Sequence, residues 1–208
     1  MLTICWAAKG GSGTTVFAAA RALASPVPTL LIDLAGDAMS VLGLPEPDGP
    51  GVFDWLSSDS SPSRLAALEL PAGARLSVLP AGRARSVTPD RWDELVRHLR
   101  ADARPVIVDA GTRPPTTPLL LAGDERLLVT RACYLALRHA VADRATPTGV
   151  VLIEEPGRAL RAADIEASLG APIVNTVLLD PAIARAVDSG LLVSRLPSGW
   201  RRQLRAAA

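Results

Sequence analysis

The chain has few of the residues that cross-link small proteins or bind metals. Its 208 residues include two cysteines, Cys5 and Cys133, which excludes a disulfide scaffold and a cysteine-rich zinc cluster. Aromatic residues make up 3%, so leucine, valine, isoleucine and alanine must fill the core. No apolar run approaches the ~20 residues that a membrane helix needs. The start, 1–4, lacks the basic residues and apolar stretch of a signal peptide, and we expect a cytoplasmic protein.

Lysine is almost absent as well. The 22 basic residues are 21 arginines and Lys9, and with 21 acidic residues the net charge is +1. This balance gives no global reason to expect nucleic-acid binding. Arginine does not replace lysine where a compact ammonium group must enter a tight pocket. Because Lys9 lies inside a glycine-rich loop, its retention indicates a specific role in that loop.

Apolar runs rich in β-branched residues alternate with helical patterns along the chain. The sequence predicts strands over 2–8, 29–34, 75–79, 105–110, 126–130, 149–153 and 173–179. It predicts helices over 14–24, 89–101 (with Thr88 as the N-cap), 134–144, 162–169, 181–188 and 200–207, a helical turn within 51–58, and loops over 45–50, 57–63 and 112–118. Such alternation is typical of a doubly wound α/β fold with a mainly parallel sheet. We therefore expect a single domain over 1–208.

A glycine-rich loop follows the first predicted strand and leads directly into a helix. Glycines let successive backbone N–H groups point at a phosphate, and the helix N-terminus adds a partial positive charge. A hydroxyl in the first helical turn can bind Mg²⁺, and Thr15 occupies that place. The candidate nucleotide-binding residues are Lys9, Gly10, Gly11, Ser12, Gly13, Thr14 and Thr15.

This loop, K-G-G-S-G-T-T, resembles the deviant Walker A motif K-G-G-x-G-K-T/S of the ParA/MinD ATPases. The resemblance continues through LLIDL at Asp33, VIVDAG at Asp109 and the closing run LGAPIVNTVLLDPAIARAVDSG. It implies a P-loop NTPase fold of the SIMIBI type, with ATP and Mg²⁺ as cofactors. In that family the first loop lysine reaches the phosphates of the partner in a homodimer, and Lys9 matches this position. The same resemblance implies Thr15, Asp33 and Asp109 as the Mg²⁺ site.

Two positions depart from the family pattern. Thr14 stands where the family has its second loop lysine, and Ala35 stands where the family usually has a second Asp close to the attacking water. Losing a hydrogen bond to a charged group costs about 1.5–3 kcal/mol, so we expect weakened nucleotide binding and slow or absent hydrolysis. Asp37 and Arg113 are candidates to replace the missing carboxylate and the missing cation. The sequence assigns no catalytic residue.

Two functions remain open at this point. The resemblance implies a nucleotide-binding, dimerising switch that positions a cargo such as a chromosome, a plasmid, or division or secretion machinery, through a partner protein. The alternative is a nucleotide-independent scaffold similar to the degenerate CpaE/TadZ branch, which the two departures favour. An enzyme of the same fold that uses ATP for synthesis or metal insertion is disfavoured, because no cysteine pair or substrate-binding cluster is present.

The C-terminal stretch Gly199–Arg205 is basic and carries two apolar residues, Trp200 and Leu204. Some members of the resembled family end in an amphipathic helix that binds membranes, and surface arginines could also contact DNA phosphates. Peripheral attachment to a membrane or nucleoid is therefore one interpretation. The favoured interpretation is a terminal helix that Trp200 and Leu204 pack onto the domain.

Overall fold

The structure, a computed structural model, describes residues 1–84, 87–143 and 145–206. Its strands form one eight-stranded sheet in the order β3-β4-β2-β5-β1-β6-β7-β8. The strands are β1 Leu2–Trp6, β2 Thr29–Asp33, β3 Leu70–Pro71, β4 Leu76–Leu79, β5 Val106–Asp109, β6 Glu125–Arg131, β7 Gly149–Glu154 and β8 Ile173–Leu178. All neighbours pair in parallel except β3 and β4. The expected doubly wound α/β fold is confirmed.

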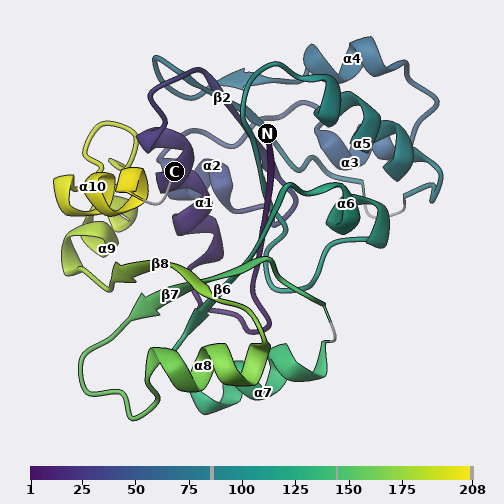
Figure 1. Ribbon diagram of the computed structural model, residues 1–208. Helices are drawn as coiled ribbons and strands as arrows, with labels where there is room; N and C mark the ends of the chain where they lie inside the picture. The colour runs from purple at the N-terminus through teal and green to yellow at the C-terminus, as the bar shows by residue number, and fades with distance from the viewer. Residues whose placement is uncertain (85–86, 144, 207–208) are drawn as a thin grey trace.

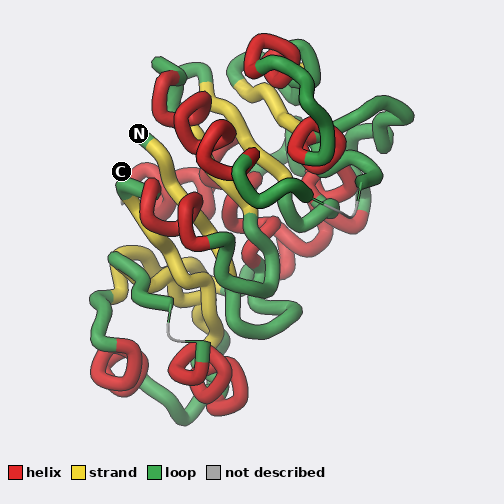
Figure 2. Tube along the Cα trace, turned by 90° about the vertical axis from the view of Figure 1, so that its right-hand side faces the viewer, coloured by secondary structure: helices red, strands yellow, loops and turns green. Residues whose placement is uncertain are grey.

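Helices cover both faces of this sheet (Figures 1 and 2). One face packs against α1 Thr14–Ala24, α2 Ala38–Leu42, α9 Pro181–Asp188 and α10 Ser198–Ala206. The other face packs against α3 Val52–Leu56, α4 Pro62–Ala66, α5 Arg91–Ala101, α6 Thr117–Ala122, α7 Tyr134–Ala142 and α8 Ala162–Leu169. Because both faces are covered, every residue of β1, β2 and β5 is buried. This explains why these strands read as continuous apolar runs rather than alternating ones.

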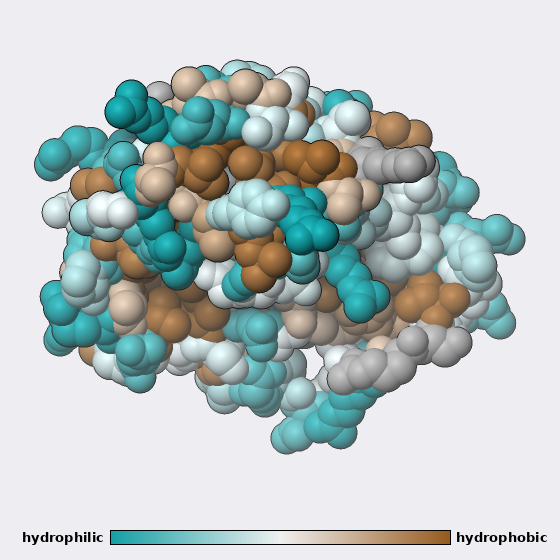
Figure 3. Space-filling model, turned by 90° about the horizontal axis from the view of Figure 1, so that it is seen from below, coloured by the Kyte–Doolittle hydropathy of each residue, from teal (hydrophilic) through white to brown (hydrophobic). Residues whose placement is uncertain are grey.

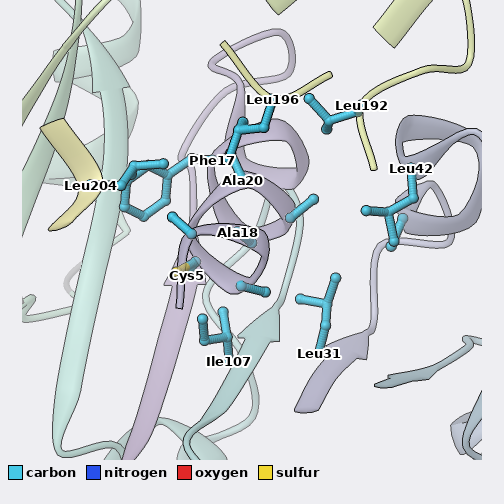
Figure 4. Packing of buried hydrophobic residues seen from close by; sticks show 14 of the residues in the cluster. Cys5, Phe17, Ala18, Ala20, Leu31, Leu42, Ile107, Leu192, Leu196 and Leu204 are labelled. Carbon is cyan, nitrogen blue, oxygen red and sulfur yellow. The ribbon is translucent and has the colours of Figure 1, made fainter. Parts of the chain in front are cut away.

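Helix α1 lies at the centre of the first helical layer. In Figure 4 its Phe17 side chain lies beside Leu204, while Leu196 lies next to the same helix near Ala20. The alanines of α1 are small enough for the helix to lie close to the sheet, where Cys5 is fully buried. The C-terminal segment thus completes the core around the helix that follows the glycine loop.

The C-terminal helix α10 is packed onto the domain. Trp200 is 3% exposed and Leu204 is 4% exposed. The indole N–H of Trp200 donates to the carbonyl oxygen of Leu178 over 3.1 Å. Both apolar residues are therefore engaged within the molecule, in agreement with the favoured interpretation of this stretch. In the described part of the chain, no helix has the length and apolar character to cross a membrane.

Helices α7 and α8 lie at one end of the molecule, and apolar side chains gather on the face seen from that end (Figure 3). Leu135 and Val141 of α7 are 44% and 55% exposed. Val174 and Leu178 of the edge strand β8 are similarly exposed. The described chain leaves these four side chains open to solvent.

Several local expectations were wrong. Segments 57–63 and 112–118 were expected to be loops, but α4 begins within the first and α6 within the second. Each helix has proline in its first turn, where the missing N–H costs nothing. Helix α5 begins at Arg91 after Asp90, so Thr88 is not its N-cap. The sequence also missed α2 and β3, which are short, and the expected helix ends at 144 and 207 lie outside the described residues.

Candidate phosphate-binding site

The glycine loop occupies the point where the chain changes direction across the sheet. Strand β1 lies between β5 and β6, and the chain visits β2 to β5 on one side of it before reaching β6 to β8 on the other. In open α/β sheets, ligands bind in the crevice at such a switch point, outside the carboxyl ends of the strands. The loop that follows β1 therefore lies where this topology places a ligand.

The backbone of the loop has the conformation that a phosphate cradle requires. Gly11 and Gly13 have φ angles of 76° and 91°, which side chains strongly disfavour. The Ser12 hydroxyl donates to the Lys9 carbonyl over 2.8 Å and closes the loop. Gly13 is the N-cap of α1 and provides no side-chain hydrogen bond, and the first turn contains no acidic residue. The N-terminus of α1 is thus left open to an anion.

A cavity of about 440 Å³ lies over this loop. Its lining consists of Lys9, Gly11, Ser12, Gly13, Thr14, Thr15, Val16, Leu34, Ala35, Asp37, Ala110, Gly111, Thr112 and Arg113. Six of the seven candidate loop residues therefore line one cavity. The seventh, Gly10, lies next to the loop after β5, because a Cβ atom at Gly10 would be 3.9 Å from the Thr112 methyl group. The structure thus places the glycine loop next to the loop that follows β5.

Asp109 is buried at the end of β5, and the residues that follow it, Ala110 and Gly111, line the cavity. Its Oδ1 accepts the Gly111 N–H over 3.0 Å, whereas its buried Oδ2 receives no hydrogen bond within the described part of the chain. Burial raises the pKa of Asp109 to about 6; the Thr15 hydroxyl and the Gly111 N–H lower it, and nearby carboxylates raise it. An unpartnered carboxylate oxygen next to the Thr15 hydroxyl fits a hard cation such as Mg²⁺, which prefers oxygen ligands.

Asp33, at the end of β2, is the register partner of Asp109 and is also buried. Its Oδ1 accepts the N–H groups of Ala35 and Gly36 over 3.0 and 2.6 Å, and its Oδ2 accepts that of Ala38 over 3.0 Å. Burial raises its pKa, and the three backbone amides partly offset this effect. Both oxygens are therefore already used to shape the loop that leads into α2. A direct Mg²⁺ contact from Asp33 stays a prediction.

The two departures from the expected pattern both lie in the cavity wall. Thr14 is 6% exposed at the start of α1, and its short side chain carries no charge. Ala35 is exposed, and a Cβ atom at Gly111 would lie 3.2 Å from the Ala35 Cβ atom. Asp37 and Arg113, the two candidate replacements, also line the cavity and are exposed. The structure thus places all four positions beside the glycine loop.

Sequence reasoning missed a second, larger cavity of about 620 Å³. Leu34 and Ala35 belong to the walls of both cavities, so the two are adjacent. The far wall is held by Asp54, whose carboxylate accepts the backbone N–H groups of Gly51, Arg83 and Ala84. The only sequence signal was the clustering of proline and glycine in 45–51 and 80–82, which marks turns.

Carboxylates and imidazoles alone do not build a metal centre here. Within the ranges that the structure describes, no three His, Cys, Asp or Glu side chains are grouped so that they could hold a metal ion. A cation at Asp109 would need further oxygen ligands from a hydroxyl, a phosphate or water. This is how proteins commonly hold Mg²⁺, with one or two protein ligands and the phosphates of the substrate.

No protein-family model matches the chain, and no curated protein matches it in sequence. Solved structures do match. A ParA family ATPase from Chlorobium tepidum TLS superposes with a TM-score of 0.80 at 20% identity, covering 98% of this chain and 95% of that chain. A chain of the MinC:MinD cell division protein complex of Aquifex aeolicus gives 0.79 at 20% identity, covering 99% and 93%. The chain has the ParA/MinD fold.

A third structure with the ParA/MinD fold is described as a nucleotide complex. The septum site-determining protein MinD from Pyrococcus horikoshii OT3, complexed with Mg-ADP, superposes with a TM-score of 0.76 at 18% identity, covering 100% of this chain and 94% of that chain. Identities at this level show a shared ParA/MinD fold, which confirms the fold that the loop motif implied. The CpaE/TadZ-like branch stays a prediction.

Proposed function

We propose that the chain is a ParA/MinD-like switch that binds Mg²⁺-ATP in the cavity over the glycine loop and pairs with a second copy of itself. The observation that carries this proposal is the buried Asp109 Oδ2, which has no hydrogen bond within the described residues and lies next to Thr15 under the loop. Leaving such an oxygen buried and unpartnered is costly unless a ligand satisfies it. The same fold carries Mg-ADP in MinD from Pyrococcus horikoshii.

In this proposal, different residues bind the phosphates and the Mg²⁺ ion. The backbone N–H groups of Gly11–Thr15 and the N-terminus of α1 bind the phosphates. The Thr15 hydroxyl and the Asp109 carboxylate hold Mg²⁺, which neutralises phosphate charge. Lys9 lines the cavity, and among the described residues its ammonium group has one hydrogen bond, to the Gly10 carbonyl over 3.3 Å. In a dimer formed across this face, Lys9 is free to reach the phosphates of the partner subunit.

Binding rather than rapid turnover is the expected output. Phosphoryl transfer needs stabilisation of the transition-state charge and a positioned water. Thr14 supplies no positive charge, and Ala35 offers no carboxylate to the cavity. Hydrolysis is therefore slow or absent, and the bound nucleotide acts by favouring one conformation or assembly state over another.

The dimer would dock on a protein partner and position a cargo. The Aquifex structure of the same fold is a complex of MinC with MinD, so this fold supports docking of another protein. On this chain, the exposed apolar side chains of α7 and β8 are available for such contacts. Larger exposed apolar patches commonly mark sites of protein interaction. Attachment to DNA or a membrane is a weaker part of the proposal, because Trp200 and Leu204 are packed inside.

A second candidate function is a nucleotide-independent scaffold for a localised complex. The same two residues, Thr14 and Ala35, favour it, since a loop that no longer binds nucleotide is free to lose both groups. The two proposals differ in their response to nucleotide. The switch binds Mg²⁺-ATP and changes its assembly state, whereas the scaffold does neither.

Calorimetric titration with ATP and ADP in the presence of Mg²⁺ tests the switch directly. The wild type and Lys9→Ala would be compared, with assembly followed by light scattering in the same samples. The switch predicts that ATP binds and produces a dimer, and that Lys9→Ala binds ATP but stays monomeric. If millimolar nucleotide neither binds nor changes the assembly state, the switch is wrong and the scaffold is supported.

A further inference from the structure

The geometry points to Arg113 as the residue that supplies the phosphate-binding positive charge missing from Thr14. This inference rests on the proposed function and names the group that makes the site work. It assigns the charge to the loop after β5 rather than to the glycine loop itself. The cavity would then bind phosphate between two loops, with the backbone cradle on one side and a guanidinium on the other.

Arg113 is placed at the cavity by the contact between the two loops. The Ala7 N–H donates to the Gly111 carbonyl over 2.8 Å, which joins the end of β1 to the turn that follows Asp109. The Thr112 methyl group is 3.9 Å from the position that a Cβ atom at Gly10 would take. Arg113 follows directly and lines the cavity together with Thr14. The loop that carries the buried Asp109 therefore also carries a cation to the open side of the same cavity.

The backbone of this loop restricts where Arg113 can go. Pro114 and Pro115 follow it, and a residue before proline is confined to extended conformations. Gly111, two residues earlier, adopts a φ of 70° and makes the turn away from Asp109. These restrictions lower the backbone entropy that is lost when the guanidinium binds, while the exposed side chain keeps its rotamer freedom.

Arg113 is also uncommitted. Within the described ranges, no hydrogen bond or ion pair engages its side chain, which is exposed. Two other arginines at the carboxyl edge of the sheet, Arg131 and Arg158, are already paired with Glu155. Among the described residues that line the cavity, only Lys9 and Arg113 are basic and only Asp37 is acidic. If Lys9 serves the partner subunit, Arg113 is the cation that the described lining of the cavity leaves for the phosphates of its own subunit.

A guanidinium group can bind a phosphate from a position outside the glycine loop. A lysine within a P-loop extends through the cradle as a compact point charge, whereas an arginine approaching from the side can form two parallel N–H···O bonds to one phosphate. Each hydrogen bond to a charged group strengthens binding enough to change affinity by roughly ten- to a hundredfold. The same change is expected on removing Arg113.

The test measures Mg²⁺-ATP affinity by calorimetry for the wild type and for Arg113→Ala, Arg113→Lys, Thr14→Lys and the double variant Arg113→Ala/Thr14→Lys. Arg113→Ala is expected to weaken binding roughly ten- to a hundredfold. Arg113→Lys is expected to weaken it less, because lysine keeps the charge but not the two parallel N–H···O bonds. In the double variant, the lysine in the loop restores what the arginine supplied. Arg97→Ala on α5 is the matched control, since Arg97 is an exposed arginine outside the cavity. The melting temperature of each variant shows whether it is folded.

The outcomes separate this inference from the function on which it rests. Wild-type protein that fails to bind Mg²⁺-ATP overturns the proposed function itself. Wild-type binding with equal affinity in Arg113→Ala leaves the proposed function standing and overturns the inference. Loss of binding in Arg113→Ala that Thr14→Lys does not restore also overturns it, because Arg113 would then act in some other way than as the replacement charge. Loss followed by rescue supports it.

Discussion

Asp33 and Asp109 occupy equivalent places on adjacent strands but have different roles. Each ends a buried parallel strand, and they face each other in the register of β2 and β5. Asp33 uses both carboxylate oxygens to accept three backbone amides. Asp109 accepts one amide with Oδ1 and leaves Oδ2 without a hydrogen bond in the described part of the chain. The first carboxylate shapes a loop, and we propose that the second binds a ligand.

This difference shows that an Asp at the end of an apolar strand is an ambiguous signal. The family resemblance assigned both carboxylates to Mg²⁺, and only the hydrogen-bond partners separate them. A buried carboxylate with full partners stabilises the fold, whereas one with an unpartnered oxygen costs stability until a ligand arrives. The following predictions test that contrast, beginning with the largest expected effect.

Removing the two carboxylates should change the stability of the apo protein by unequal amounts. Asp33→Ala leaves the N–H groups of Ala35, Gly36 and Ala38 without an acceptor, and we expect it to lower the free energy of unfolding by roughly 3–5 kcal/mol. Asp109→Ala removes one hydrogen bond but also a costly buried charge, so its change should be about 1 kcal/mol or less. Urea unfolding at pH 7 measures both. Equal losses in the two variants would contradict the division of roles.

The raised pKa of Asp109 makes the stability of the apo protein depend on pH. Its pKa is about 6 in the folded protein, against 3.8 for an unperturbed aspartate side chain, so the folded state holds the proton more tightly and this group weakens the fold as pH rises from about 4 to 6. Asp109→Asn removes this cost. We expect the variant to be more stable by roughly 2–3 kcal/mol above pH 6, with the gain lost near pH 4.

Thermal or urea unfolding of Asp109→Asn across pH 4–8 measures this gain, and Asp33→Asn is the matched control. The control also neutralises a buried carboxylate whose pKa is raised, but its new NH₂ group must face a backbone N–H that now has no acceptor. Its gain should therefore be smaller. If Asp109→Asn were less stable than the wild type at pH 8, Oδ2 would have a hydrogen-bond partner in the apo protein, which would contradict its proposed role as a ligand-binding atom.

Substituting the glycines that follow the two carboxylates should have the smallest effect on stability. Gly36 and Gly111 have φ angles of 92° and 70°, so alanine at either position should cost about 1–2 kcal/mol. Gly111→Ala should cost somewhat more, because its Cβ atom would lie 3.2 Å from that of Ala35, whereas nothing lies within 4 Å at Gly36. Melting temperatures of the two variants report the difference. A larger loss of stability for Gly36→Ala would show that the loops after β2 and β5 are not tightly packed at Gly111.

Much of the fold could be predicted from the sequence because its signals are local and strong. Strands buried on both faces read as continuous apolar runs, and the predicted helix 14–24 coincides with α1. The short elements α2, α4 and β3 were not found, since five or fewer residues carry little periodicity, although the equally short α3 lies within the helical turn expected over 51–58. Thr88 was misplaced as an N-cap because helix ends depend on a few hydrogen bonds that composition does not fix.

The candidate site was predictable in its members but not in their roles. The glycine loop, Thr15 and Asp109 could be located because a strand, a turn and a helix must be contiguous in sequence to build a cradle. That both oxygens of Asp33 accept hydrogen bonds could not be foreseen, because their partners arise from the turn 35–38 that follows it. The second cavity beside Ala35 depends on packing between segments far apart in the chain, which a sequence pattern does not report.

The central claim is that Asp109 and the glycine loop hold a Mg²⁺-nucleotide. The most direct measurement is the affinity for ATP with and without Mg²⁺, in the wild type and in Asp109→Asn. We predict that Mg²⁺ strengthens ATP binding to the wild type by about tenfold or more, and that this gain is lost in Asp109→Asn while the protein stays folded. A gain from Mg²⁺ of the same size in Asp109→Asn, or no binding by the wild type, would contradict the claim.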